Sequence, residues 1–206
     1  MTSWYERKVL PQIIRLACGC PSLVDDRRSI VSQARGRVLE LGLGAGANLP
    51  FYDVGAVSEV VGVEPSPELR DIAGAAPRAE GLKLDLRDGA AESLPFDAAS
   101  FDAVVCTFTL CTVKDADKAL SEARRVLRPG GSFFFCEHGA APDPSVARWQ
   151  KRLEPTWKRL FGGCHLTRDV SAGIGRRFQI ETISKGYLPK GPKFASWMER
   201  GRAIAA

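Results

Sequence analysis

Short apolar runs alternate with amphipathic stretches through the middle of the chain. Each run is rich in branched or aromatic residues and ends at a glycine, a proline or a polar residue, which is typical of buried strands. Between them lie stretches with helical spacing, such as residues 67–76 and the stripe from Ala119 to Leu127 that stops at Pro129. Strands are predicted at residues 37–41, 59–63, 82–86, 101–107 and 132–137. The alternation indicates an α/β fold with a mostly parallel sheet covered by helices on both faces.

The two ends of the chain depart from this alternation. Residues 1–35 have helical spacing, with a second helix predicted at residues 25–34, and a further helix is expected to begin near Asn48 and Pro50. A helical insertion is predicted at residues 145–165, a helix at 168–178, and two short strands within residues 180–198. We therefore expect a single domain with four parts. These are an N-terminal helical cap (1–36), a core (37–141), a helical insertion (142–167) and a C-terminal helix with strands (168–206).

Composition narrows the class of protein without identifying it. The 206 residues are 45% hydrophobic and 26% charged, which excludes collagen, coiled coil and wholesale disorder. The net charge of +5 comes from scattered basic pairs, so it favours an anionic small molecule over a nucleic acid. No run of eighteen apolar residues and no cleavable leader is visible, so six reduced cysteines in a cytoplasmic protein are expected.

The first predicted strand ends in a glycine-rich turn, Gly42-Leu-Gly-Ala-Gly46. Glycine permits positive φ and lets a ligand approach the backbone closely, so the turn is a candidate cofactor site. This pattern alone leaves alternatives open. It also fits a loose nicotinamide-dinucleotide fingerprint, a binding module without catalysis, or a tight turn that holds no ligand.

Three further features favour one alternative. Glu40 stands two residues before the first glycine, Glu64 follows the second strand, and Leu127-Arg-Pro-Gly-Gly131 precedes the fifth strand. In this order, residues 38–137 resemble a class I S-adenosylmethionine-dependent methyltransferase. The resemblance implies a Rossmann-like, seven-stranded, mostly parallel sheet with helices on both faces and a small helical cap. It also implies S-adenosylmethionine as cofactor and S-adenosylhomocysteine as product.

The resemblance assigns cofactor-binding roles to individual residues. The glycines would pass under the methionine end, Glu40 would act near its amino group, and Glu64 would hold the ribose hydroxyls. Ala91 and Glu92 would flank the adenine, and Thr107 and Phe108 would face the methionine and methyl groups. Many relatives carry an aspartate that reaches the adenine amino group where this chain has Ala90, so another group must serve that end. The implied set is Glu40, Gly42, Gly44, Gly46, Glu64, Ala91, Glu92, Thr107 and Phe108.

Segments outside the cofactor motifs point to a narrower family. They are residues 46–52, 105–113, 136–139, 154–158 and 163–168. Together they are similar to the methyltransferase-like seven family, whose animal members are alkyl-thiol S-methyltransferases. The resemblance implies S-methylation of a small thiol. Those animal members carry an N-terminal hydrophobic anchor that is not visible in this sequence, so membrane attachment is not expected to carry over.

Candidate catalytic residues follow from the same segments. A thiol has a pKa of about 8.5, so some thiolate is present at neutral pH and no strong base is needed. His138 follows the fifth strand and should face the substrate crevice, where it would serve as a base or an orienting group. His165 lies in the insertion that would roof the site. A structural role remains the alternative for both histidines.

The remaining expectations concern metals, partners and rival reactions. No pair of cysteines has Cys-x-x-Cys spacing, so no metal site is expected. Cys111 and Cys164 are interpreted as apolar fillers, with the lining of a thiol pocket as the alternative. The partner is expected to be a small-molecule acceptor, with no nucleic acid and no membrane span. Peripheral membrane contact and a choice between monomer and homodimer are left open. Rival reactions are N-, O- or C-methylation of a small metabolite or lipid head group, and hydride transfer by a nicotinamide enzyme.

Overall fold

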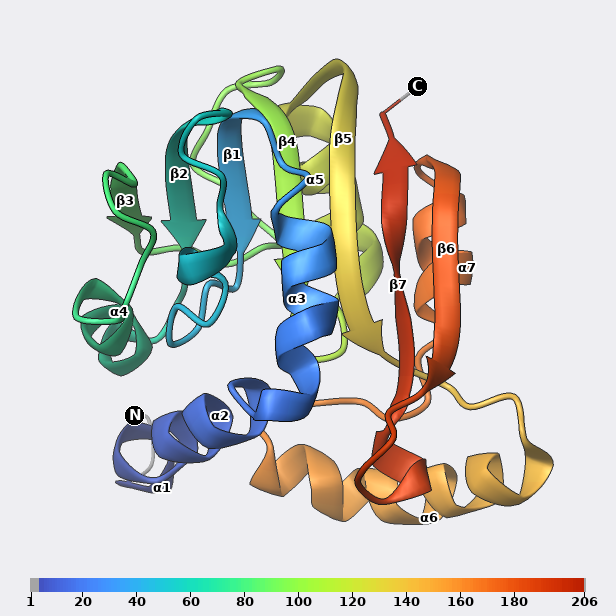
Figure 1. Cartoon of the computed structure of the whole chain (residues 1–206). Coiled ribbons are helices and arrows are strands. Elements are labelled where there is room, and N and C mark those ends of the chain that lie inside the picture. Colours follow the sequence, from blue (N-terminus) through green and yellow to red (C-terminus); the bar gives the residue numbers. More distant parts are fainter. Residues whose placement is uncertain (1–3, 206) are drawn as a thin grey trace.

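The computed structural model describes residues 4–205 and is built on one seven-stranded sheet (Figure 1). The strand order is β3-β2-β1-β4-β5-β7-β6, and β7 runs antiparallel to both of its neighbours. The four pairings among β1 to β5 are all parallel, as the apolar runs predict. The strands are β1 (Gly36–Leu41), β2 (Val57–Val63), β3 (Leu84–Arg87), β4 (Phe101–Thr107), β5 (Leu127–His138), β6 (Gln179–Tyr187) and β7 (Trp197–Ile204). This is the predicted Rossmann-like sheet.

Helices cover both faces of the sheet and create two hydrophobic cores. One core includes Ile30 of α3 and Ala73 of α4, and the other includes Leu120 of α5 and Ile174 of α7. Three further helices, α1, α2 and α6, lie below the carboxyl ends of the parallel strands (Figure 1). The α-helices are α1 (Trp4–Lys8), α2 (Leu10–Cys18), α3 (Val24–Val31), α4 (Pro67–Gly74), α5 (Ala116–Val126), α6 (Pro144–Leu160) and α7 (Val170–Gly175). Three single-turn 3₁₀ segments are η1 (Pro21–Leu23), η2 (Leu49–Phe51) and η3 (Lys193–Ala195).

The N-terminal helices and α6 meet at that carboxyl edge. The Tyr5 hydroxyl donates to the Leu160 carbonyl at 2.6 Å, which ties α1 to the end of α6. Leu10 of α2 also lies close to Gly162, just after α6. Across residues 4–205, no helix combines the length and the apolar character that a membrane crossing requires.

One predicted helix is absent. The segment after the glycine turn forms turns and then the single 3₁₀ turn η2, whereas the sequence predicts an α-helix starting near Asn48 and Pro50. The physical reason lies in Asn48, because its side chain points into the core and bonds to other core residues instead of capping a helix. The cofactor turn is therefore presented by loop backbone and not by a helix N-terminus.

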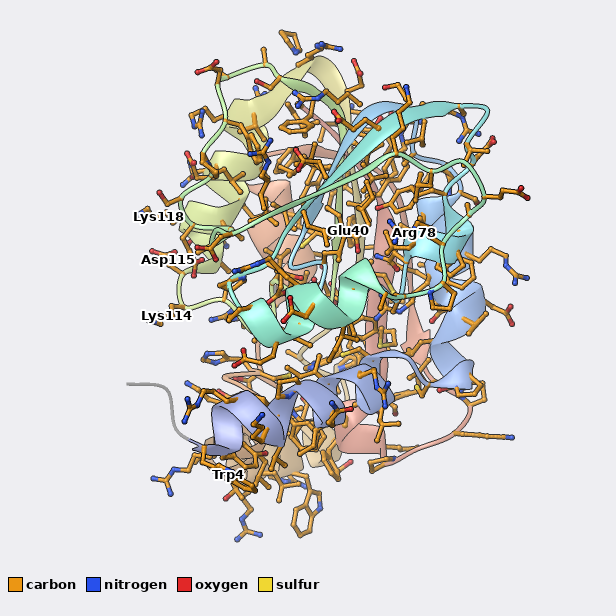
Figure 2. The ribbon with its side chains drawn as sticks, turned by 90° about the vertical axis from the view of Figure 1, so that its left-hand side faces the viewer. Trp4, Glu40, Arg78, Lys114, Asp115 and Lys118 are labelled. Carbon is orange, nitrogen blue, oxygen red and sulfur yellow. The ribbon has the colours of Figure 1, made fainter. Side chains whose placement is uncertain are left out.

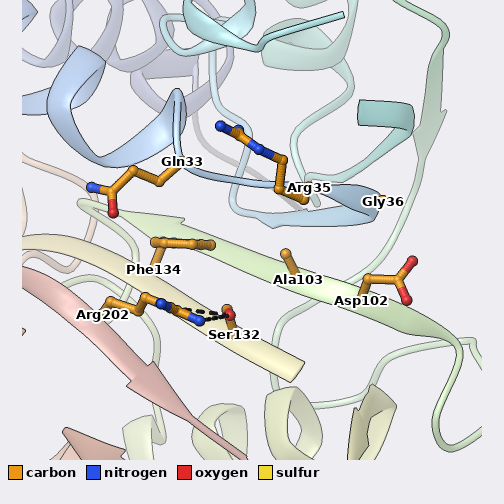
Figure 3. A pocket seen from close by; sticks show the side chains of 8 residues that line it. All are labelled: Gln33, Arg35, Gly36, Asp102, Ala103, Ser132, Phe134 and Arg202. Carbon is orange, nitrogen blue, oxygen red and sulfur yellow. Dashed lines mark hydrogen bonds between the residues drawn. The ribbon is translucent and has the colours of Figure 1, made fainter. Parts of the chain in front are cut away.

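The opposite, amino-terminal edge of the sheet carries a hollow of about 440 Å³ (Figure 3). Its lining comes from the starts of β1 and β4, the middle of β5 and the Arg202 side chain, which donates to the Ser132 hydroxyl. None of the residues that carry the candidate chemistry lines it. In open parallel sheets, ligands bind at the carboxyl ends of the strands, so we place the functional site at the other edge.

Candidate active site

The glycine turn after β1, residues 42–46, presents open backbone at the carboxyl edge of the sheet, and we call it the ledge. Gly42, Gly44 and Gly46 have φ of +60°, +58° and +80°, a conformation that L side chains rarely adopt. A Cβ placed on Gly44 would have only the Gly42 carbonyl oxygen within 4 Å, at 3.8 Å, so the space above this residue is open. The turn thus exposes backbone to a ligand at the position that the sequence predicts.

Glu64 lies directly after β2, beside that ledge. One carboxylate oxygen accepts the backbone N–H of Gly44 and the other that of Ser66, both at 3.0 Å. Burial raises the pKa of Glu64, while these two N–H groups lower it. Because each oxygen uses only one of its acceptor sites, the carboxylate retains capacity for the two hydroxyls of a ribose.

Glu40, near the end of β1, is buried in the interior of the molecule (Figure 2). Its carboxylate accepts from the Asn48 amide at 2.9 Å and from the Tyr52 hydroxyl at 2.6 Å. Burial raises the pKa of Glu40 to about 7, against the lowering effect of these two hydrogen bonds and of Arg27. Both carboxylate oxygens of Glu40 are thus engaged within the core, and its contact with the cofactor's amino group stays a prediction.

The sequence analysis missed Arg27, a buried arginine of α3 that completes this network. Its guanidinium donates to Asn48 Oδ1 and Thr107 Oγ1, both at 2.8 Å, and to the Cys18 carbonyl. It also lies over the Phe108 ring, 4.8 Å from the centroid. The arginine was hard to find because the pair Arg27-Arg28 resembles an ordinary exposed helix face, and only Arg28 is exposed.

Thr107 ends β4 and Phe108 follows it, where the resemblance places the methyl group. Thr107 Oγ1 accepts from Arg27 and Asn48, so its own hydrogen remains available to donate. Phe108 has a φ of +56°, a conformation that costs a non-glycine residue free energy and that clusters at functional sites. Its ring centroid lies 6.4 Å from that of His138.

The predicted adenine end is only partly assembled from the expected side chains. Ala91 is buried, whereas one Glu92 oxygen accepts the backbone N–H groups of Lys114 and Asp115. Asp88 is exposed and pairs with Arg70 at 2.6 Å. Glu92 therefore ties the loop after β3 to the start of α5, and its adenine contact stays a prediction.

His138, the last residue of β5, does face the carboxyl edge, but it is 9% exposed. Its Nε2 lies 2.8 Å from Cys164 Sγ, and its Nδ1 is buried without a hydrogen-bond partner among the described residues. Burial lowers the pKa of His138, but the hydrogen bond to Cys164 and the charges of Cys164 and Glu137 together outweigh it, so the net shift is upward. The hydrogen bond to Cys111 and burial raise the pKa of the Cys164 thiol far above its usual value.

His165 lies at the rim of the same region. Its backbone N–H donates to the Cys111 carbonyl at 2.7 Å, and its Nδ1 is 3.3 Å from a Glu154 oxygen. Burial and the charges of Arg168 and Lys158 lower the pKa of His165. The structure therefore brings His138 and His165 to one corner of the molecule, where the imidazole of His165 is held by Glu154.

These features fit S-adenosylmethionine on the structure's own terms. An open ledge, a carboxylate with spare acceptor sites and a hydroxyl with a spare hydrogen lie in sequence along the ends of β1, β2 and β4. They match the backbone approach, the diol and the polar amino-acid end of the cofactor in turn.

Comparisons with known proteins agree with this geometry. The profile of the family described as "Methyltransferase domain" matches residues 39–135. The Rattus norvegicus protein named thiol S-methyltransferase TMT1B is 43% identical over 172 residues, which are 81% of this chain and 68% of that protein. This chain belongs to the class I S-adenosylmethionine-dependent methyltransferases. Its cofactor is S-adenosylmethionine.

Other members match less of their own length. The Homo sapiens protein named thiol S-methyltransferase TMT1A is 41% identical over 144 residues, which are 68% of this chain and 58% of that protein. The chain thus spans about two thirds or less of the mammalian methyltransferases that it resembles.

Solved structures confirm the fold. A Thermotoga maritima protein described as an S-adenosylmethionine-dependent methyltransferase and possible histamine N-methyltransferase superposes with a TM-score of 0.69. It is 20% identical, with 97% of each chain covered. The [4+2]-cyclase SpnF superposes with a TM-score of 0.68 at 19% identity, covering 88% of this chain and 79% of that one. Because a cyclase has this fold too, the fold alone does not give the methyl acceptor.

Proposed function

We propose that this methyltransferase transfers the methyl group to the sulfur of a small thiol. The observation that carries the proposal is the similarity to thiol S-methyltransferases over 81% of the chain. That match is much longer than the methyltransferase domain match of residues 39–135, so the similarity extends beyond the segments of the cofactor motifs.

The carboxylates at the acceptor end support a thiol. Glu137 accepts three backbone N–H groups, and Glu154 accepts two besides its contact with His165. A carboxylate engaged in this way is a poor general base. An acceptor that ionises near neutral pH without a strong base therefore suits the site, and a thiol does so more readily than an alcohol or an alkylammonium group.

The proposal gives the chain's residues distinct tasks. Bound S-adenosylmethionine supplies a methyl group on an activated sulfonium. Gly42, Gly44 and Gly46 support the methionine end, Glu64 accepts from the ribose, and Thr107 donates to the amino-acid end. Arg27 fixes Thr107 and the Phe108 ring so that the acceptor meets the methyl group in line.

The proposal also includes the size of the acceptor and the location of the protein in the cell. The buried position of His138 suits a small acceptor and not a nucleic acid. None of the six cysteines forms a disulfide, which is in keeping with a cytoplasmic protein.

Two measurements test the proposal. Calorimetric titration should show binding of S-adenosylhomocysteine and none of NADH. Incubation with cofactor bearing a deuterated methyl group, and separately with an alkanethiol, an alkylamine and a phenol, should label the thiol as a methyl thioether. Label found only in the amine or the phenol, as mass spectrometry would show, refutes the thiol assignment.

A further inference from the structure

Three side chains able to bind a metal converge beside the predicted methyl-transfer site. Cys111 follows β4, His138 ends β5, and Cys164 follows α6. Their ligand atoms all lie within 4.8 Å of one another, and the residues are 1%, 9% and 8% exposed. The sequence spacing gave no sign of this cluster, because its members come from three segments that only the tertiary structure brings together.

The surrounding structure holds each member in place. The Glu137 carboxylate accepts the backbone N–H groups of Thr109, Leu110 and Cys111 at 2.7, 3.0 and 3.2 Å, which fixes the turn that carries Cys111. The His165 N–H donates to the Cys111 carbonyl and links this turn to the segment of Cys164. The cluster is therefore preorganised by backbone contacts and does not depend on the mutual attraction of its side chains.

One of the sulfurs also has a polar neighbour of the kind that supports a metal thiolate. Trp157 Nε1–H points at Cys164 Sγ over 3.4 Å. Donors to sulfur, placed around the ligands, are a regular part of metal–thiolate sites.

The nitrogen that His138 offers to an ion can be named. Nε2 is the ring nitrogen beside a sulfur, 2.8 Å from Cys164 Sγ. A neutral imidazole binds a metal through one nitrogen and carries its hydrogen on the other, so Nε2 is the ligand atom and Nδ1 keeps the hydrogen. Nδ1 is buried without a hydrogen-bond partner among the described residues.

The chemistry of the set selects the ion. Two thiolates and a neutral imidazole are the soft and borderline donors that Zn²⁺ prefers, and their charge balances that of the ion, which makes burial tolerable. Tetrahedral Zn²⁺ has bonds of about 2.3 Å to sulfur and 2.0–2.1 Å to nitrogen, which puts the sulfurs about 3.8 Å apart. The observed spacing allows this once the His138–Cys164 contact opens slightly.

We propose that Cys111, His138 and Cys164 bind one Zn²⁺ ion, and that the acceptor thiol occupies its fourth position as a thiolate. Three protein ligands with one open position are typical of catalytic zinc sites. The second part of the proposal rests on the proposed thiol methylation and names how that thiol is activated.

The step balances without a further reactant. The acceptor R–SH binds Zn²⁺ through sulfur and releases its proton to solvent. A sulfur lone pair then forms a bond to the methyl carbon of the cofactor. The bond between that carbon and the sulfonium sulfur breaks, and its electron pair stays on the cofactor sulfur. The products are R–S–CH₃ and S-adenosylhomocysteine, and the neutral thioether leaves the ion as a weaker ligand.

The test uses Co²⁺ as an optical probe for the proposed zinc site. The full chain is stripped with a chelator, kept reduced with a phosphine and titrated with Co²⁺. We expect one equivalent to give the thiolate-to-cobalt charge-transfer band and the visible bands of a tetrahedral ion, and Zn²⁺ to displace both. Cys111→Ser and Cys164→Ser should each remove the charge-transfer intensity in part and weaken Zn²⁺ binding at least about a hundredfold, beyond the loss typical of an outer-shell partner.

The matched control is Cys20→Ser, which changes a cysteine whose sulfur lies beside Ser22. It should titrate like the wild type. Binding of S-adenosylhomocysteine by every variant shows that each one is folded. Absence of the cobalt bands in the folded, reduced wild type overturns the proposal, and so does their persistence in the Cys111→Ser/Cys164→Ser double variant.

The role of the fourth position has its own readout. Adding an alkanethiol to the Co²⁺ protein should intensify the charge-transfer band, whereas an alkylamine of the same chain length should not. An unchanged spectrum with the thiol removes thiolate binding from the proposal. Cobalt bands without any methyl thioether product would reject the proposed function and keep the metal site. Thioether production that continues after the metal is chelated would reject the role of the metal and keep the proposed function.

Discussion

Gly44 and Gly81 share a backbone conformation but differ in their surroundings. Both have positive φ, +58° and +81°, and neither has an atom that would clash with a Cβ. Gly44 lies on the cofactor ledge, whereas Gly81 lies in an exposed turn before β3. The pair therefore separates the backbone cost of a substitution from its effect on the ligand.

We predict that Gly44→Ala and Gly81→Ala each destabilise the protein by about 1–2 kcal/mol, the cost of a left-handed conformation for alanine. Only Gly44→Ala should weaken S-adenosylhomocysteine binding, by at least about tenfold. Thermal unfolding and calorimetry measure the two effects. Equal affinities in the two variants would contradict the proposed position of the cofactor.

Glu64 provides a second test at the same scale. Glu64→Gln keeps the shape of the side chain but replaces one acceptor oxygen with an amide NH₂ donor. The side chain then loses one of its two bonds from backbone N–H groups, and it can no longer accept from both ribose hydroxyls. We expect S-adenosylhomocysteine affinity to fall about 10- to 100-fold, or roughly 1.4–3 kcal/mol. Glu59→Gln, which removes a half-exposed pair with Arg37, is the control and should bind normally. An unchanged affinity for Glu64→Gln would reject the ribose contact.

Glu40 makes stability depend on pH in an unusual direction. Its pKa in the folded protein is about 7, above the ordinary value of 4.5, so the folded state holds more protons than the unfolded state between these values. Stability from this group is thus complete at low pH and is lost as pH rises to about 7, by up to about 1.4 kcal/mol per pH unit. Urea unfolding should show that Glu40→Gln removes this component. Parallel pH profiles for the two proteins would contradict it.

At the scale of elements, Arg27 of α3 joins the end of α2 to the end of β4 and to Asn48 in the loop after β1. Replacing it with methionine removes the donors to the Cys18 carbonyl, Asn48 and Thr107 together. Amide hydrogen exchange in α2 (Leu10–Cys18) should then accelerate at least about tenfold, while the sheet stays protected. Arg28→Met alters the exposed neighbour on the same helix and should leave α2 unchanged. Equal exchange rates in α2 for both variants would show that Arg27 does not hold that helix.

The strands were predictable from the sequence, and the reasons are local. An apolar run such as Phe101–Thr107 buries both faces of a strand, so its pattern and its structure coincide. The glycine turn and Glu64 were equally visible, because backbone conformation and strand ends fix their places.

What the sequence did not reveal depends on contacts between distant segments. The helix expected after the glycine turn fails because Asn48 serves a buried network with Glu40, Thr107 and Arg27. The cluster of two cysteines with His138 combines segments 26 to 53 residues apart, so no spacing rule could find it. The periodicity of apolar residues indicates which face of a helix or strand a residue lies on. It does not indicate which residue of another segment packs against it there.

At the scale of the whole molecule, the two edges of the sheet differ in chemistry. The amino edge has a hollow lined by Arg35, Asp102 and Arg202, away from the candidate site. The carboxyl edge, below which α1, α2 and α6 lie, brings together the ledge, Glu64, the Arg27 network and the His138 cluster (Figure 1). Our proposal therefore puts cofactor and acceptor at the carboxyl edge, with the acceptor between the ends of β4 and β5.

The central claim is that this edge methylates sulfur. The most direct measurement is a competition in which an alkanethiol, an alkylamine and a phenol of similar size share one reaction with cofactor bearing a deuterated methyl group. The account predicts that the labelled methyl thioether exceeds both other products at least about a hundredfold, a difference of roughly 2.7 kcal/mol in transition-state free energy. A labelled amine or ether as the main product would contradict it.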